Sequence, residues 1–459
     1  MAGAGMVGAA IAYGLAGLGQ RVLLIDGADT DYRAAKANFG LVWLQGKGLN
    51  HPHYQRLSYR SVRQWPAFAR ELQEESGVDL HYERRGGLHF CLGEAELEAR
   101  AARMQAWLRQ APEVGECVSI LPRDALLRRY PGLALGPEVS GASVGELDGH
   151  ANPLRLLAAL QSGFQRRGGQ LWGNSPVHGI RALSGGGFEV EAGTRRARAA
   201  RLVIAAGLGS IRLGPMVGLD VPLRPQRGQI LVTERLAPIL PVPANGIRQT
   251  GEGTVMVGLT QEEVGFDLST TTDAAVRMSR NALRVLPALA QARLVRQWSC
   301  LRVMTPDGCP VYASSQHFPG AYIALCHSGV TLAAVHAGEY ARSLAAGAPL
   351  LSWMSFIMSA SMFRKLHESG AASLTLTIDG EPVTAEAGES VAAVLLRQTT
   401  PASRSTPVNE SPRAPYCMMG VCFECLAIID GVASTQSCMV PVREGMRVER
   451  QHGKRSVQA

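Results

Sequence analysis

From the N-terminus to about Ser343, short apolar runs alternate with stretches in which apolar residues recur at helical spacing. Apolar runs of this length, separated by helices, are typical of an α/β domain. No internal repeat is visible. We therefore expect one large α/β region over most of the chain.

The last part of the chain has a different pattern. Residues 374–386, LTLTIDGEPVTAE, contain two alternating runs around Asp379-Gly380, which predicts a two-residue β-hairpin. The segment GESVAAVLLRQ predicts a helix that begins near Glu389, and a second Asp-Gly turn at 430 and 431 follows the strand LAIID. Hairpin, helix, loop and hairpin together predict a small, β-grasp-like α+β module.

Between these two parts we expect a linker with a packing helix at 345–372. The residues between Arg342 and Arg364 carry no charge, and their number is large enough to suggest a membrane span. Gly347, Pro349 and several serines interrupt this stretch and favour a helix end, a turn and a packing helix instead. The expected organisation is therefore 1–344, 345–372 and 373–459, without a membrane span.

Composition excludes several classes of protein. Of the 459 residues, 46% are apolar and 18% are charged, as in a folded globular enzyme and unlike a disordered chain or a coiled coil. The net charge is +8, and because lysine occurs only at 36, 47, 365 and 454, arginine supplies most of the positive charge. No basic run is interleaved with aromatic residues, so we expect no nucleic-acid partner.

The nine cysteines bear on location and on metal binding, since four of them crowd near the C-terminus. An odd total without a signal peptide predicts a reducing, cytoplasmic compartment and a metal site. Attachment to a membrane surface through a partner protein is the alternative location. Cys91, Cys117, Cys309 and Cys326 have no ligand spacing, and we interpret them as ordinary buried thiols.

The chain opens with a glycine motif, MAGAGMVGAAIAYGLAGLGQRVLLID. Gly3 permits a tight turn, Gly5 lets the backbone approach a pyrophosphate, and Gly8 allows close helix packing. Asp26 follows the strand RVLLI and can accept a hydrogen bond from a ribose hydroxyl, so the motif predicts dinucleotide binding. An apolar strand should precede Gly3, but only Met1 and Ala2 stand before it. Either the recorded start of the sequence lies downstream of the true start, or the protein lacks this strand. We favour the first explanation.

Two later segments belong to the same predicted site. SPVHGI at 175–180 and ARLVIAAGLGS at 200–210, which contains Gly207, predict a strand and a glycine turn over the adenosine half. ALCHSGVTLAAVHAGEYARSL at 324–344 predicts a strand, a glycine turn and a helix. The free N–H groups at its start could hold a flavin carbonyl oxygen, and His327 is either part of this site or an ordinary turn residue. The expected cofactor contacts in this turn are His327, Ser328, Gly329, Val330 and Thr331.

The cysteine cluster has the spacing C-x4-C-x2-C-x12-C, formed by Cys417, Cys422, Cys425 and Cys438. This is the plant-type order of a [2Fe-2S] site, in which one loop supplies three thiolates and a later segment the fourth. Gly420 relaxes the loop so that backbone N–H groups can point at the sulfurs. Zinc is the alternative, but it usually takes paired C-x2-C knuckles, and the cluster contains only one.

These motifs together resemble the D-amino-acid oxidase superfamily of FAD enzymes, and in particular the flavin subunits of hydrogen cyanide synthase, opine oxidase and D-hydroxyproline dehydrogenase. The resemblance is carried by GAGMVGAA, ANFGLVWLQGKG, LRPQRGQILVTERL, IRQTGEGTVMVGLTQEEVGFD, LRVMTPDGCPVY and CHSGVTLAA. The C-terminal part, through REGMRVERQ, resembles the small iron-sulfur subunit of the same enzymes. The resemblance implies FAD rather than NAD in a Rossmann-like domain, and a mixed-sheet substrate domain that begins near Pro225.

The resemblance also implies roles for single residues. Asn38 and Gly40 are expected near the flavin and Val177 near the adenine, while Arg302 of the R-x-x-T-P-D-G motif is expected to pair with a substrate carboxylate. A planar guanidinium suits this task because it forms two parallel charge-assisted hydrogen bonds. A structural ion pair is the alternative role for Arg302.

Four further residues are candidates near the active site. Three of them follow the segment expected to face the flavin: Gln45, Lys47 and His51. Each of the three either lines the active site or has only a packing or capping role. Sarcosine oxidases have a flavin-linked cysteine at a position similar to that of Cys300, so a covalent link to the flavin is one role for this residue. The alternative is a buried, inert thiol. We name no catalytic base, since hydride transfer from a neutral amine requires none.

The expected function is an FAD-dependent dehydrogenase that oxidises the C–N bond of an amino or imino acid, such as a D-amino acid, D-hydroxyproline, glycine or an opine. Electrons would leave through the cluster, because a flavin takes two electrons and a [2Fe-2S] centre carries one at a time. A second, larger flavoprotein subunit is the expected partner. The alternatives are an oxygen-reducing oxidase with a non-essential cluster and a non-catalytic electron-transfer subunit with a disabled flavin fold.

Overall fold

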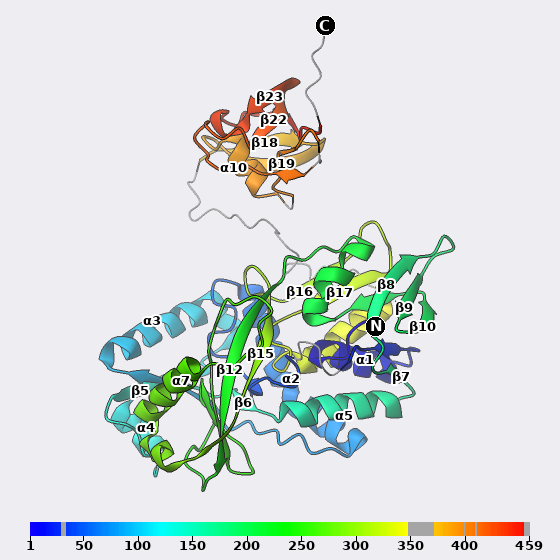
Figure 1. Ribbon diagram of the computed structural model, residues 1–459. Helices are drawn as coiled ribbons and strands as arrows, with labels where there is room; N and C mark the ends of the chain where they lie inside the picture. Colours follow the sequence, from blue (N-terminus) through cyan, green and yellow to red (C-terminus); the bar gives the residue numbers. More distant parts are fainter. Residues whose placement is uncertain (29–33, 348–370, 399, 409–410, 454–459) are drawn as a thin grey trace. The chain divides into compact units, whose positions relative to one another are not determined.

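The computed structural model describes residues 1–28, 34–347, 371–398, 400–408 and 411–453. The chain forms two compact units, Met1–Phe356 and Ile357–Ala459 (Figure 1). Each unit has its own buried apolar core. The expected linker and packing helix fall almost wholly at 348–370, outside the described residues.

A parallel sheet organises the first unit around the first residues of the chain. Ala2 bridges in parallel to Ile25 on one side and to Ile204 on the other. The N–H of Ala2 donates to Val203 O at 2.9 Å, and the N–H of Gly3 donates to Ile25 O at 2.8 Å. The central position that the glycine motif requires is therefore filled by a bridge rather than by a full strand. The flanking strands are β1 (Leu23–Ile25) with β7 (Gln170–Trp172) on one side, and β11 (Leu202–Ile204), β17 (Ala321–Leu325) and β16 (Val311–Ser314) on the other.

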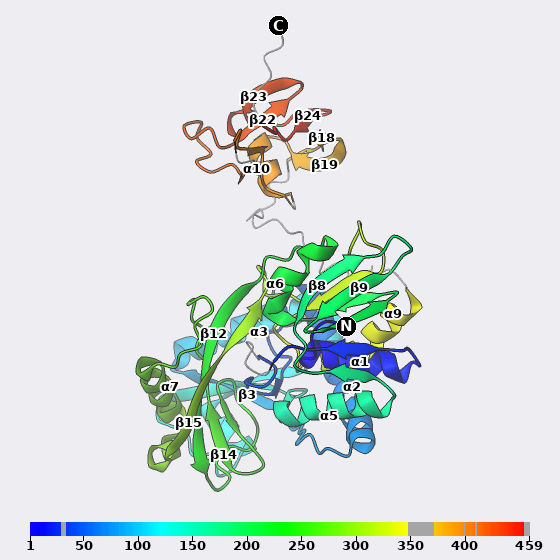
Figure 2. The ribbon, with the colours of Figure 1, turned by 45° about the vertical axis from the view of Figure 1, so that its right-hand side comes forward.

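Helices cover this sheet. α1 follows the glycine turn directly and packs on α5 and on the helical segment near the end of the unit (Figure 2). Its small residues permit this, since a Cβ at Gly14 would overlap Ala337 O. α5 is capped at its N-terminus, because Asn152 Oδ1 accepts hydrogen bonds from the N–H groups of Leu154 and Arg155. The helices are α1 (Met6–Gly17), α2 (Pro52–Ser76), α5 (Pro153–Arg166), α8 (Ala333–Val335), the π-helix η5 (His336–Tyr340) and α9 (Ala341–Ala346).

A second, antiparallel layer forms the other end of the first unit. Its strand orders are β13-β14-β12-β15 and β3-β5-β4, and a bridge between Leu88 and Ala244 joins the two parts. The long pair β12–β15 places Gly228 opposite Cys300 and Gln226 opposite Arg302. The strands are β3 (Gly87–Leu92), β4 (Val118–Pro122), β5 (Val139–Gly145), β12 (Arg224–Arg235), β13 (Ile247–Gln249), β14 (Thr254–Val257) and β15 (Leu294–Met304).

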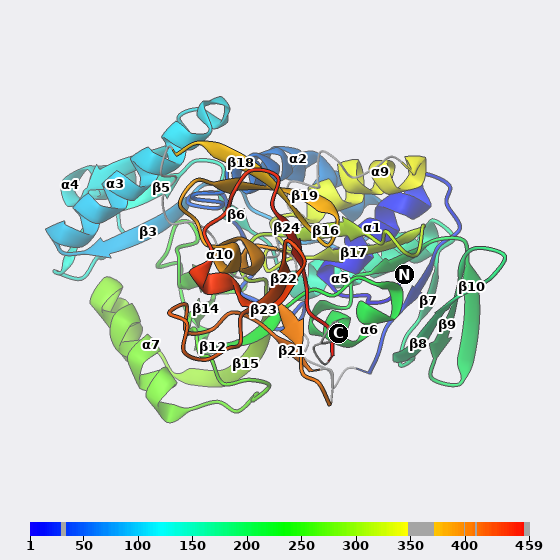
Figure 3. The ribbon, with the colours of Figure 1, turned by 90° about the horizontal axis from the view of Figure 1, so that it is seen from above.

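The remaining elements of the first unit edge these layers. α7 and the β8-β9-β10 meander lie at opposite ends of the unit (Figures 1 and 3). The remaining helices and strands of this unit are α3 (Glu94–Gln110), α4 (Arg123–Arg129), α6 (Ser210–Leu213), α7 (Thr272–Val285), β2 (Leu41–Val42), β6 (Gly149–His150), β8 (Val177–Ala182), β9 (Phe188–Ala192) and β10 (Arg195–Ala199).

The second unit is a five-stranded mixed sheet with one helix against it. Both predicted Asp-Gly hairpins are present, with positive φ at both turn residues: 52° and 87° at Asp379 and Gly380, and 48° and 83° at Asp430 and Gly431. The sheet order is β19-β18-β24-β22-β23, with β18 and β24 parallel. The elements are β18 (Ser373–Ile378), β19 (Glu381–Glu386), α10 (Val391–Leu396), β20 (Arg404–Ser405), β21 (Pro412–Arg413), β22 (Leu426–Ile429), β23 (Val432–Gln436) and β24 (Arg447–Glu449).

The helix expected near Glu389 begins at Val391, because Ser390 Oγ accepts the N–H of Ala393 and so caps it. No helix in the described ranges is long and apolar enough to cross a membrane. The uncharged stretch that raised this question lies mostly at 348–370, outside the described residues. The α/β class with a mixed-sheet layer and a small α+β module is confirmed.

Candidate functional site

One cavity of about 890 Å³ in the first unit runs from the glycine turn to the β12–β15 pair. It brings together most of the predicted cofactor and substrate residues although they come from distant parts of the chain. Gly8, Gln45 and His51 do not line it. Those that do are Gly3, Gly5, Asp26, Asn38, Gly40, Lys47, Val177, Gly207, Cys300, Arg302, His327, Ser328, Gly329, Val330 and Thr331.

The glycine turn is shaped to admit a dinucleotide. Gly3 has φ +105°, and a Cβ at Gly8 would overlap Gly3 O, so the turn can pack against α1 only with glycine there. A Cβ at Gly5 would meet nothing nearer than Ala35 Cβ at 3.8 Å. No side chain caps the start of α1 at Gly5, so its first N–H groups can bind an anion. These residues fit a pyrophosphate.

The segment 37–43 and the turn at 326–331 also line the cavity. Asn38 acts on its own loop, since Oδ1 accepts the N–H of Gly40 at 2.8 Å and Nδ2 donates to Ala35 O at 2.8 Å. Thr331 Oγ1 accepts the N–H of Trp43 at 3.1 Å, which ties the two segments together. These are the two segments beside which the flavin is expected.

Arg302 enters the cavity from β15. Its Nη1 donates to Gln226 Oε1 at 3.4 Å and to Arg227 O at 3.3 Å, and no carboxylate in the described ranges forms an ion pair with it. A Cβ at Gly228 would stand 2.6 Å from the Arg302 Cζ, so glycine at this position makes room for the guanidinium. The missing ion pair favours the substrate role of Arg302 over the structural one. Gly228 is a site residue that the sequence analysis did not single out.

Lys47 also reaches the cavity. Its Nζ donates to Ser328 Oγ at 2.6 Å, and the Tyr54 hydroxyl lies 2.6 Å from the same oxygen. Burial lowers the pKa of Lys47 to about 8. Burial also lowers the pKa of His327 to about 3, so this neighbouring imidazole is neutral. Nothing in the local sequence marks Tyr54 as part of this group, because it stands near the start of α2.

Gln45 belongs to a buried network instead of the cavity wall. Its Nε2 donates to Asp148 Oδ2 at 2.8 Å and to Gly87 O at 3.1 Å. Its Oε1 accepts from Arg100 Nη2 at 2.8 Å and from Ser143 Oγ at 2.6 Å. All its hydrogen-bonding capacity is used there. The contacts of Gln45 therefore correspond to the packing alternative and not to active-site lining.

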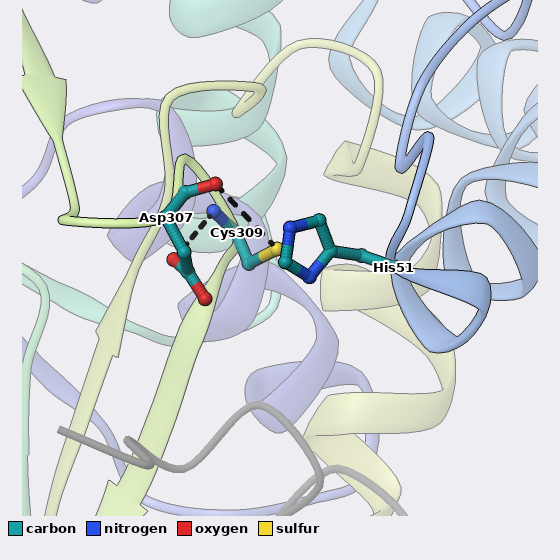
Figure 4. A group of neighbouring side chains, drawn as sticks. All are labelled: His51, Asp307 and Cys309. Carbon is teal, nitrogen blue, oxygen red and sulfur yellow. Dashed lines mark hydrogen bonds between the residues drawn. The ribbon is translucent and has the colours of Figure 1, made fainter. Parts of the chain in front are cut away.

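His51 likewise lies away from the cavity, at the start of α2. Its side chain makes no capping hydrogen bond, and its ring lies beside the Cys309 sulfur with Asp307 next in line (Figure 4). The ligand-type atoms of His51, Asp307 and Cys309 lie within 4.8 Å of one another. Asp307 is exposed and its Oδ1 accepts the N–H of Cys309 at 2.9 Å, which forms the turn of the T-P-D-G motif. We assign no metal to this group.

Cys300 lines the cavity but has the character of an inert thiol. It is buried, and its sulfur donates to Ala37 O at 3.6 Å. Burial raises its pKa, which disfavours the thiolate that a flavin linkage would need. Cys91, Cys117, Cys309 and Cys326 are buried free thiols, as expected.

The four clustered cysteines lie in the second unit as two pairs. The Cys425 thiol donates to the Cys438 sulfur at 3.3 Å, and Cys417 interacts with Cys422. No three of these described sulfurs lie within 4.8 Å of one another, whereas a tetrahedral zinc site places all four about 3.8 Å apart. Two thiolate pairs match the two irons of a [2Fe-2S] cluster.

The cysteine loop also points N–H groups at the sulfurs. The N–H of Met419, the Cys422 thiol and further loop N–H groups lower the pKa of Cys417 to about 6. Gly420 has φ +81° and its N–H is directed at Cys438, the role expected for this glycine. Met418 and Phe423 also have positive φ, at 57° and 56°, so the loop is held in a conformation that few side chains adopt.

Apolar side chains surround this loop at the surface. We call them the apolar collar, and they are Tyr416, Met418, Met419, Val421, Phe423 and Met439, all exposed. An exposed apolar patch of this kind marks an interaction site.

The first unit has a glycine turn on a Rossmann-like sheet and a cavity that ends at Arg302, which forms no ion pair within the described ranges. The second unit has a loop with two cysteine pairs. Together these features define a flavin-type oxidoreductase with an iron-sulfur module. The chain belongs to the family described as FAD dependent oxidoreductase, whose model matches residues 2–343. A model described as 2Fe-2S iron-sulfur cluster binding domain matches residues 371–453. The chain is therefore an oxidoreductase with FAD and a [2Fe-2S] cluster, and the expected fusion is confirmed.

The relatives lie in the superfamily that the motifs resemble. An opine oxidase subunit of Agrobacterium tumefaciens (strain Ach5) is 43% identical over 345 residues, which cover 75% of this chain and 92% of the relative. The HcnC protein of Pseudomonas aeruginosa hydrogen cyanide synthase is 28% identical over 374 residues, covering 71% and 86%. The crystal structure of glycine oxidase from Geobacillus kaustophilus matches with a TM-score of 0.71 at 26% identity, over 80% of this chain and 98% of that chain.

Proposed function

We propose that this protein is a dehydrogenase that oxidises the C–N bond of an amino or imino acid and passes the electrons out through its own cluster. The observation that carries the proposal is Arg302, a half-buried guanidinium that lines the cavity without a carboxylate partner in the described ranges. The relatives named as an opine oxidase and a glycine oxidase support the same reaction class. The proposed substrates are a D-amino acid, D-hydroxyproline, glycine or an opine.

The residues of the cavity suggest how the chain contributes to this reaction. Arg302 binds the substrate carboxylate through its fork, while Gln226 and Arg227 O hold Nη1 in place. Among the described lining residues, the one acid is Asp26, which belongs to the dinucleotide end. No carboxylate among these lining residues is therefore placed near Arg302 to act as a base, and His327 is a weak one because burial lowers its pKa to about 3. We propose that the amine loses its proton before it reacts. When bound, FAD accepts a hydride equivalent and the cluster carries electrons singly.

The nucleotide contacts follow from the same cavity. We propose that Gly3, Gly5 and the start of α1 hold the pyrophosphate, and that Asp26 holds the ribose. Val177 and Gly207 would line the adenosine half, while the turn at 326–331, Asn38 and Gly40 would surround the flavin. Gly8 contributes by packing α1 against Gly3.

Partner and location are also proposals. The apolar collar supports docking of a partner beside the cluster, and relatives that are themselves named as subunits agree with a second, larger flavoprotein subunit. Nine free cysteines agree with a reducing, cytoplasmic compartment. Attachment at a membrane through the partner is the alternative proposal.

The decisive experiment is anaerobic reduction of the holoprotein by candidate amino and imino acids, followed by visible absorbance and electron paramagnetic resonance. We expect the flavin band to bleach first and the cluster signal of the reduced state to appear second. Rapid peroxide formation in air without another acceptor would favour the oxidase. Protein that keeps cluster bands but binds no flavin would favour the non-catalytic subunit.

A further inference from the structure

The loop at 414–425 carries three of the cluster cysteines but has little support of its own. It belongs to no helix or strand. Met418, Gly420 and Phe423 have positive φ, at 57°, 81° and 56°. Because two of these residues are not glycine, the backbone does not favour this conformation by itself. Contacts from outside the loop must therefore hold it in place.

The sheet of the second unit fixes one pair of cysteines. β22 begins directly after Cys425, and its first residue, Leu426, pairs with Gln436 at the end of β23. Ser437 extends this contact, since its N–H donates to Cys425 O at 3.2 Å and its Oγ donates to the same oxygen at 2.5 Å. Cys425 is therefore held beside Cys438, which is the next residue along the chain.

A side chain holds the other part of the loop. Gln436 Nε2 donates to Gly420 O at 2.7 Å. Apart from hydrogen bonds that involve the cysteine sulfurs, no other hydrogen bond in the described part of the chain reaches residues 417–423 from outside. The space beside Gly420 is also filled, since a Cβ added there would stand 3.1 Å from Met439 Sδ. Gln436 thus links the strand that leads to the fourth cysteine with the middle of the loop that carries the other three.

The position of this loop decides which N–H groups meet the sulfurs. The N–H of Met419 donates to Cys417 Sγ at 3.5 Å, and the N–H of Glu424 donates to Cys422 Sγ at 3.5 Å. Reduction adds negative charge to a cluster and its sulfurs, so N–H groups directed at them stabilise the reduced state. Met419 directly precedes Gly420, so a shift of the loop at Gly420 takes this N–H away from the sulfur.

We propose that Gln436 is a positioning residue of the [2Fe-2S] cluster and raises its reduction potential. Its amide anchors the cysteine loop at Gly420 and so keeps the Met419 N–H on its sulfur. Gln436 acts through the loop and touches no sulfur itself. This inference concerns the second unit alone, and it goes beyond the proposed function because it does not depend on which substrate reduces the flavin.

The test is the midpoint potential of the cluster in the holoprotein, measured by redox titration with electron paramagnetic resonance. Gln436→Met keeps the length of the side chain and removes its N–H donors. We expect the equilibrium constant for cluster reduction to fall about 10-fold, as the loss of one hydrogen bond to a charged group predicts. For a one-electron couple this is a shift of about 59 mV to lower potential.

A matched control separates positioning from a purely structural role. Gln398 Nε2 also donates to a main-chain oxygen of the second unit, Val394 O, at 2.8 Å, and this bond lies at the end of α10. Gln398→Met therefore makes the same substitution and removes the same kind of hydrogen bond elsewhere in the unit. We expect it to lower the thermal stability and to leave the potential of the cluster at the wild-type value.

A second variant keeps the test decisive if Gln436→Met fails to assemble the cluster. Gln436→Glu preserves the shape and polarity of the side chain, but an ionised carboxylate donates no hydrogen bond, so the potential should again fall. Resonance Raman spectra of the iron–sulfur stretches in H₂O and D₂O report the N–H groups on the sulfurs. We expect the isotope shift of the wild type to be smaller in both Gln436 variants and unchanged in Gln398→Met.

Three results would overturn the proposal. A wild-type potential in the Gln436 variants removes Gln436 from any role in setting it. A raised potential shows that water admitted to the cluster outweighs the lost N–H contact. An equal fall in Gln398→Met shows a general loosening of the unit instead of an effect of the loop. Failure of every amino or imino acid to reduce the flavin would remove the proposed function and leave this test unaffected.

Discussion

Gly228 sets the position of Arg302, and replacing it tests the carboxylate role without touching the guanidinium itself. A Cβ at Gly228 would stand 2.6 Å from the Arg302 Cζ, against an ordinary contact distance that begins at 3.4 Å. In Gly228→Ala the guanidinium must therefore move by at least about 0.8 Å, because its Nη2 lies nearer still. The backbone of Gly228 is extended strand without positive φ, so alanine itself fits β12.

The expected effect is on substrate use rather than on folding. A displacement near 1 Å of a positioning group costs on the order of 100-fold in rate, so we expect kcat/KM for the best amino or imino acid to fall by about that factor. Alanine in a compatible conformation changes stability by about 1 kcal/mol or less. Steady-state kinetics with an artificial acceptor, normalised to bound FAD, measures the first effect, and thermal unfolding measures the second.

A double-mutant cycle makes the test specific. If Gly228 acts through Arg302, then Gly228→Ala has little further effect in an Arg302→Ala background. Gly251→Ala serves as the matched control, since a Cβ there meets nothing within 4 Å. An equal loss on both backgrounds would refute the reasoning, because the methyl group would then be acting on something other than the guanidinium.

Further predictions concern the other parts of the site. Arg302→Ala should lower kcat/KM by about 30- to 4,000-fold, mainly through KM and with FAD still bound, as expected for one partner of a buried charge pair; an unchanged KM would contradict its role. Gly8→Val should yield protein without flavin absorbance because its side chain would overlap Gly3 O, and full FAD content would be the contrary result. Cys425→Ser should abolish the cluster signal and reduction of one-electron acceptors while substrate still bleaches the flavin, and unchanged turnover with every acceptor would exclude electron exit through the cluster.

Local motifs were predictable because their physics is local. The glycine turn needs particular residues at three nearby positions, and both Asp-Gly hairpins need two residues with positive φ. The helix expected near Glu389 begins at Val391, and its exact start is set by the hydrogen bond that Ser390 Oγ accepts from the N–H of Ala393. The cysteine spacing indicated a cluster, but the pairing of the sulfurs became visible only in the folded loop.

The three residues expected near the active site show that position in the sequence does not by itself predict where a side chain points. Gln45, Lys47 and His51 lie within seven residues of one another, yet their side chains go to a buried network, to the cavity and to the T-P-D-G turn respectively. Residues this close in a turning segment point in different directions, and the direction depends on what packs against them. No property of the segment itself separates the three.

The sequence alone determined the order of the two redox modules and the dinucleotide turn, and it predicted the four cluster ligands, because each rests on residue types at short, fixed separations. The role of Arg302 came from the family resemblance and stays a proposal. Tertiary structure alone decided that residues 1–3 complete the central sheet, that Gly228 makes room for Arg302, and that Lys47 and Tyr54 meet at the Ser328 hydroxyl. These pairings join positions as much as 281 residues apart. They depend on which surfaces meet when two sheets and several helices bury their apolar faces, and that competition is settled by the whole chain at once.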